Sequence, residues 1–234
     1  MRLLSLTLLL SMSMLGIQTN DKSVVPTQAP RITLNSDVVI SDLSPSAFRT
    51  ILNAAIDNRI PIGIIVDSTH RLCRRTMNGG RRRETLTQFV SDINLSIPGY
   101  KAQFDGAVLN VYPTDIEVPT ESLLKLRIPE FRSGPDSHQG LGVNLWMFIR
   151  AMIAPGEGTA FVGASSTSRE TVNAIETKNQ RVDTILNAII VKGSGGAWVL
   201  QSAMVKDLSP KTLRPYEVLG YSGEEQSLRN LSCE

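Results

Sequence analysis

Two stretches of this chain carry nearly the same phrase, TILNAAI at residues 50–56 and TILNAII at residues 184–190. Around each phrase, apolar residues recur at the 3, 4, 7 and 8 spacing of one face of an α-helix. The first stripe is Phe48, Ile51, Leu52, Ala55 and Ile56, and the second is Val182, Ile185, Leu186, Ile189 and Ile190. Each stretch therefore predicts a helix that buries one apolar face.

The flanking residues extend the match. Ser44 and Pro45 are typical of a helix start, because a serine hydroxyl caps the first turn and proline has no N–H to leave unpaired there. An apolar run at residues 61–66 and another at 196–201 follow the two phrases, and we expect each to form a strand. A degenerate tandem repeat of helix, turn and strand explains this match. A chance match of common helix residues is the alternative.

The rest of the chain mixes short strand patterns with amphipathic helix patterns. We expect strands at residues 31–34, 38–40, 124–128, 159–163 and 171–175, helices at 84–94 and 145–153, and a hairpin at 100–112 that turns on Asp105-Gly106. Trp146 and Trp198 lie among apolar residues and are expected in the core. The pattern predicts an α+β fold made of two small sheet-plus-helix subdomains.

The order of segments predicts an exported protein with two domains. Arg2 precedes an apolar stretch from Leu3 to Ile17, which is shorter than the roughly 20 residues of a membrane span and is typical of a signal peptide. We expect a signal peptide at 1–20, a flexible leader at 21–30, a first domain at 31–113, a linker at 114–120, a second domain at 121–208 and a C-terminal tail at 209–234. The mature protein is then secreted or periplasmic, without stable membrane insertion.

Residues 46–113 resemble the short N-terminal periplasmic module of secretins and TonB-dependent receptors, here called STN-like. The resemblance rests on FRTILNAAIDNRIPIGIIVD (48–67), a helix that leads into a strand. It continues in MNGGRRRETLTQFVSDINLSIPGYKAQFDGAVLNVYP (77–113), where a glycine precedes a helix and a strand pair ends the unit. It implies a non-enzymatic protein-interaction module of the bacterial envelope, with an envelope protein as partner and no cofactor. The remainder resembles a bacterial secreted protein.

Charge is concentrated in one segment. The net charge of the whole chain is +2, so bulk electrostatics does not favour nucleic acid or an anionic membrane as partner. The basic residues gather in HRLCRRTMNGGRRRE, and they are Arg71, Arg74, Arg75, Arg81, Arg82 and Arg83. If residues 70–76 form a strand, the charges would protect a sheet edge; alternatively, the arginines form a site for an acidic partner. No aromatic residue interrupts them, and the glycines lack nucleotide-binding spacing, so neither nucleic acid nor a nucleotide is expected.

The cysteines and histidines allow two further hypotheses. An exported chain with only Cys73 and Cys233 predicts a disulfide between them, whereas a zinc site with His70 and His138 lacks the paired spacing of zinc motifs. Serine, histidine and aspartate also occur together in VDSTH (66–70) and GPDSHQG (134–140). Neighbours in a short loop are typical of a polar turn. The competing hypothesis is a secreted hydrolase with a site centred on His138 or His70.

Overall fold

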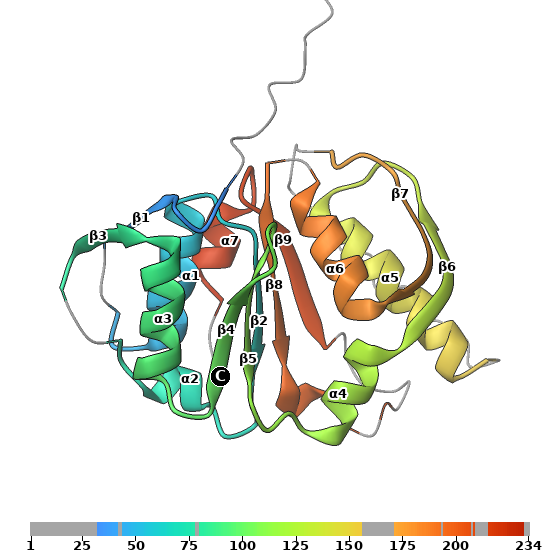
Figure 1. Cartoon of the computed structure of the whole chain (residues 1–234). Helices are drawn as coiled ribbons and strands as arrows, with labels where there is room; N and C mark the ends of the chain where they lie inside the picture. Colours follow the sequence, from blue (N-terminus) through green and yellow to red (C-terminus); the bar gives the residue numbers. More distant parts are fainter. Residues whose placement is uncertain are drawn as a thin grey trace, which may run out of the picture. The chain divides into compact units, whose positions relative to one another are not determined.

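A five-stranded sheet lies at the centre of the fold (Figure 1). The computed structural model describes residues 32–41, 44–77, 80–155, 171–192, 194–206, 208 and 215–231. The order of strands in the sheet is β4 (Tyr100–Phe104), β5 (Leu109–Pro113), β2 (Ile62–Val66), β8 (Gly196–Gln201) and β9 (Tyr216–Gly220). The three inner strands are parallel, and the two outer strands are antiparallel to their neighbours. Because β2 is buried on both faces, its sequence is a continuous apolar run.

Helices cover both faces of the sheet, and a two-stranded ribbon lies over each pair of helices (Figure 1). On one face, α1 (Ala47–Asp57) and α3 (Leu86–Ser96) pack beneath β1 (Asp37–Ile40) and β3 (Arg82–Thr85). On the other, α5 (His138–Ile153) and α6 (Val182–Val191) pack beneath β6 (Arg127–Ser133) and β7 (Ile175–Arg181). The short elements are α2 (Arg71–Arg74), α4 (Val118–Lys125), the 3-10 turn η1 (Ser202–Met204) and α7 (Glu225–Arg229). The predicted α+β class is confirmed.

The two TILNA phrases lie in α1 and α6, and every residue of both predicted stripes is buried. The helices pack on opposite faces of the same sheet. Ile62 and Ile64 of β2 face α1, whereas Trp198 and Leu200 of β8 face α6. Two separate subdomains would place each helix on a sheet of its own, whereas β2 and β8 are hydrogen-bonded neighbours in one sheet.

By the order of elements, α6 corresponds to a different helix from the one that the repeated phrase suggests. α6 follows β7 directly and leads into the β8–β9 hairpin, just as α3 follows β3 and leads into the β4–β5 hairpin. By this order the counterpart of α6 is α3, although the phrase matches α1. The tandem repeat suggested by the phrase remains a prediction.

The structure corrects several local predictions in the first half. No strand forms at residues 32–34; Ser36 N–H donates to the Thr33 carbonyl in a turn, and β1 pairs with β3 instead. Residues 70–76 do not form the strand that the edge-protection alternative required, because residues 71–74 form the one-turn helix α2. The carboxylate of Asp67 accepts the Arg71 N–H and thereby supports that turn. The helix at 84–94 and the hairpin at 100–112 are confirmed as α3 and β4–β5.

The second half differs more from expectation. α4 occupies part of the predicted linker and of the strand predicted at 124–128, so β6 begins only at Arg127. The strand predicted at 171–175 begins at Ile175 instead. The segment 209–234 contributes β9 and α7, and residues 31–234 form one unit. The signal peptide, the leader and the strand predicted at 159–163 lie outside the described residues.

Candidate functional site

The structure divides the predicted arginine site into paired and exposed members. Arg71 donates to Asp67 through Nε at 2.7 Å and to Asp115 through Nη2 at 2.6 Å. These bonds, first that to Asp115 and then that to Asp67, raise the pKa of Arg71. Arg82 likewise bonds the carboxylates of Glu84 at 2.8 Å and Asp92 at 2.6 Å. Both arginines are used within the fold.

The other arginines point to solvent. Arg74, Arg75 and Arg81 are exposed, and none of the three forms a salt bridge within the described residues. Arg83 is 70% exposed and lies 3.9 Å from the equally exposed Asp37, a pair that contributes little. The predicted set of six thus reduces to Arg74, Arg75, Arg81 and Arg83, here called the arginine surface. The cluster was evident from the sequence, but Asp67, Asp115 and Asp92, which neutralise Arg71 and Arg82, lie outside the elements that carry these arginines.

Cys73 lies on α2 and is disulfide-bonded. Its predicted partner Cys233 lies outside the described residues. In the described part of the chain, no group of three or more His, Cys, Asp or Glu side chains is placed to hold a metal ion.

The VDSTH segment follows β2 and forms a polar network with the ends of β5 and β8. Asp67 is 2% exposed, and Tyr100 Oη donates to its carboxylate at 2.9 Å. Ser68 Oγ donates to Glu117 at 2.7 Å, and Ser202 Oγ donates to the other oxygen of the same carboxylate. His70 occupies the N-cap position of α2, and its backbone is in the left-handed conformation with a φ of 54°. The polar side chains of this segment connect the carboxyl ends of three strands.

The second segment with Ser, His and Asp starts α5. Ser137 Oγ accepts the Gly140 N–H, as expected of an N-cap, and Asp136 pairs through its backbone with Val172. His138 is fully buried, and its ring packs against Gly220, where a Cβ would lie 2.4 Å from Nδ1. A substrate would not reach His138 in this conformation. The polar turn predicted at 134–140 is corrected in part, because α5 begins at His138.

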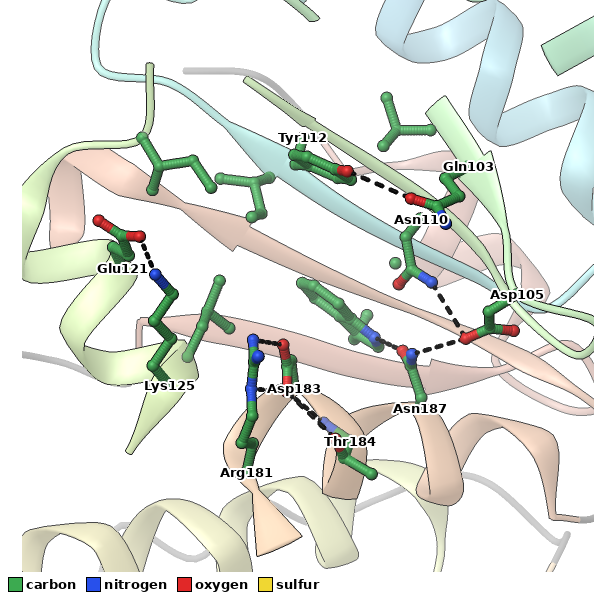
Figure 2. Close-up of a pocket in the computed structure, with 16 residues that line it drawn as sticks. Gln103, Asp105, Asn110, Tyr112, Glu121, Lys125, Arg181, Asp183, Thr184 and Asn187 are labelled. Atoms are coloured by element: carbon green, nitrogen blue, oxygen red, sulfur yellow. Dashed lines mark hydrogen bonds and ion pairs between the residues drawn. The ribbon is translucent and has the colours of Figure 1, made fainter. Parts of the chain in front are cut away.

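A groove that the sequence did not predict lies on the α6 side of the sheet, with a volume of about 570 Å³ (Figure 2). It exists because α1 and α3 cover only the opposite face of β4, β5 and β2, while α6 and α4 border this face. Its floor is apolar and consists of Ile65, Ile116, Leu124 and the indole of Trp198. The indole lies across Gly63, where a Cβ would be 2.3 Å from Trp198 Cε2. Only glycine allows this close approach.

One wall of the groove is a polar network (Figure 2). Trp198 Nε1 donates to Asn187 Oδ1 at 2.7 Å, which orients the amide of Asn187 on α6. The amides of Asn187 and Asn110 both approach Asp105 Oδ2, at 3.5 and 3.4 Å. The other oxygen of Asp105 accepts the N–H groups of Ala107 and Val108 and forms the hairpin turn. This wall of the groove therefore presents fixed amides and one carboxylate beside an apolar floor.

The opposite end of the groove carries two ion pairs, Lys125 with Glu121 on α4 and Arg181 with Asp183 at the start of α6 (Figure 2). The prediction that Trp198 is a core residue is confirmed, since it is 3% exposed. Its position at the floor of a groove was missed, because the lining comes from seven elements that are spread along the sequence. The glycine inside β2 was the available signal.

Within the described residues, no helix has the length and apolar character needed to cross a membrane. Comparison with protein-family models, with curated proteins and with solved structures found no match.

Proposed function

We propose that this protein is an exported, non-enzymatic interaction module of the bacterial envelope that docks an acidic partner on its arginine surface. The observation that carries the proposal is the contrast among neighbouring arginines. Arg71 and Arg82 are neutralised by carboxylates of the fold, whereas Arg74, Arg75 and Arg81 are exposed and lack a salt bridge in the described part of the chain. Guanidinium groups that are exposed to water are available to bind the carboxylates of a partner.

The arrangement of elements offers further support. Residues 47–113 run as helix, strand, helix and strand pair, with only the short α2 and β3 between them. This is the order that the STN-like resemblance implies. The competing proposal of a hydrolase has less support, because His138 is buried and Ser68 and Ser137 bond within the fold.

The experiment begins with crosslinking and capture of the secreted protein in its native host, followed by purification of the captured protein. Replacing Arg74, Arg75 and Arg81 with alanine should then lower the association rate by about tenfold or more, because exposed charges steer the encounter. The affinity of the unmodified protein should also fall as salt rises, since these charges are screened within about 8 Å at physiological ionic strength. Surface plasmon resonance measures both.

The matched control replaces three exposed basic residues of the β6–β7 ribbon, Arg127, Arg132 and Lys178, with alanine. It removes the same charge from another surface and should leave association unchanged. Equal losses in the two variants would mean that only total charge matters. Unchanged binding by the arginine variant, together with a lower melting temperature or aggregation, would show that these residues protect the surface rather than dock a partner.

A further inference from the structure

We propose that the groove over β5, β2 and β8 binds an extended peptide that carries one apolar and one basic side chain. This inference extends the proposed interaction function by adding a second site and the chemistry of its ligand. It depends on three features of the groove, which are its apolar floor, an unused amide pair and an unbalanced carboxylate.

The floor is suited to a single apolar side chain. Ile65, Ile116 and Leu124 surround one patch beside the indole of Trp198, and the volume of about 570 Å³ lies in the range of small-ligand sites. Hydrogen bonding of Trp198 Nε1 to Asn187 and contact with Gly63 hold the indole in place. The patch is therefore formed before any ligand arrives, which reduces the entropy lost on binding.

Gln103 and Asn110 provide a donor and an acceptor for a main-chain amide. They are directly opposite each other in the β4–β5 register, and both line the groove. Asn110 Nδ2 is directed at Asp105 and the Val108 carbonyl, and Gln103 Oε1 accepts from Tyr112. Asn110 Oδ1 and Gln103 Nε2 have no hydrogen-bond partner within the described residues. One acceptor beside one donor matches the N–H and C=O groups of a peptide chain.

Charge complementarity selects the second side chain. Three acidic residues and two basic residues line the groove, so it carries one net negative charge. Lys125 and Arg181 are paired with Glu121 and Asp183, whereas Asp105 is exposed and has no basic partner in the described part of the chain. A lysine or arginine next to the bound amide would reach Asp105 and balance its charge.

Titration of the purified protein with the blocked peptide acetyl-Lys-Gly-Leu-Gly-amide tests the proposal. The chain has two tryptophans, and only Trp198 lines the groove, while Trp146 contacts Tyr216 in the core. In ¹H–¹⁵N NMR spectra the indole signal of Trp198 should shift with peptide and that of Trp146 should not, with a Trp146→Phe variant assigning the two signals. Comparison peptides replace the lysine with glutamate or the leucine with glycine. N-acetylglucosamine trimer supplies the same amide from a sugar.

Two variants test the recognition groups. Asp105→Asn keeps the oxygen that forms the turn and removes the charge, so it should raise the Kd for the lysine peptide about 2- to 5-fold. Gln103→Ala should weaken binding, and Gln180→Ala, which removes an exposed strand glutamine from β7, should not.

The proposal is overturned if the lysine peptide leaves the Trp198 signal unchanged at millimolar concentration, if the glutamate peptide binds equally well, or if the sugar trimer binds more tightly than the peptide. The result is independent of the arginine surface, because the probe peptide has no acidic group and the signal arises in the groove. If a partner binds equally well after Arg74, Arg75 and Arg81 are replaced, the proposed docking surface is refuted, but this test of the groove is not affected.

Discussion

Two carboxylates, those of Asp67 and Glu117, connect the loops at the carboxyl ends of the parallel strands. Burial alone would raise the pKa of Asp67, but hydrogen bonds from Thr69, Arg71 and Tyr100 outweigh it and lower the pKa. Glu117 behaves in the same way, because bonds from Ser202 and Ser68 outweigh its desolvation. Both groups therefore bind protons less readily in the folded chain than in the unfolded chain.

These shifts predict how stability depends on pH. Because the folded pKa lies below the unfolded value, the stabilisation is fully present above about pH 5 and is lost as pH falls below about 4. Asp67→Asn should lower the free energy of unfolding at pH 7 by about 1–3 kcal/mol and make its decline below pH 5 less steep. Urea titrations between pH 3 and pH 7 measure both effects.

The control for this prediction is Asp115→Asn. Asp115 also bonds Arg71, but its side chain is 69% exposed, and water replaces the bond. Its loss should change stability far less than the loss of Asp67. A pH profile of Asp67→Asn that parallels that of the unmodified protein would contradict the assignment.

At the scale of elements, two asparagines occupy strand edges that would otherwise be open. Asn94 on α3 accepts the Ala102 N–H at 2.7 Å and donates to the Ala102 carbonyl at 3.2 Å, along the free edge of β4. Asn58 makes the same pair of bonds with Val39 of β1, at 2.9 and 2.8 Å. A side-chain amide thus takes the place of a neighbouring strand, which is one way to prevent pairing with other chains. Asparagines, and not the arginines, protect these two edges.

Asn94→Ala should therefore have two effects. Loss of the two bonds should destabilise the protein by about 1–2 kcal/mol, and the open β4 edge should promote association between chains. Leu95→Ala is the matched control, because Leu95 is the next residue of α3 and is 79% exposed. Denaturant titration and analytical ultracentrifugation give the two readouts. A monomer of unchanged stability would show that the amide is dispensable.

At the scale of the molecule, the last segment closes the fold. β9 covers the free edge of β8, and α7 returns to α1, where Arg229 bonds Asp57 at 2.6 Å and Arg49 donates to the Arg229 carbonyl. Leu228 is fully buried in the same core as Phe48. β9 therefore contributes to the core on the α5 side of the sheet, and α7 contributes to the core on the α1 side. Both cores depend on this last segment.

Deleting residues 209–234 should accordingly abolish cooperative unfolding. The deletion exposes the edge of β8 and removes the apolar residues Val218 and Tyr221 from the two cores, which are losses of the kind that cost several kcal/mol each. Deleting residues 1–30, which are outside the unit formed by residues 31–234, should leave the transition intact. A Cys73→Ser, Cys233→Ser variant distinguishes loss of packing from loss of a disulfide. Circular dichroism and calorimetry measure the transition; a shortened chain that unfolds as the full chain does would refute the prediction.

The local apolar pattern determined where α1, α3 and α6 lie and which residues they bury, because helical periodicity depends only on neighbours in sequence. It also located β2, β8 and the β4–β5 hairpin. The arginine cluster was also evident, because its members are close together in the sequence. The sequence did not show which of these arginines would be neutralised by carboxylates of the fold.

Tertiary structure alone decided which elements meet. An apolar stripe on a helix has the same sequence pattern whichever face of a sheet the helix covers. The sequence therefore could not show that α1 and α6 lie on opposite faces of one sheet. Pairing of β1 with β3, and of β8 with β9, joins segments whose register no local pattern records. The groove exists only where Gly63, Gln103, Leu124 and Trp198 converge from different elements, and such convergence depends on long-range packing.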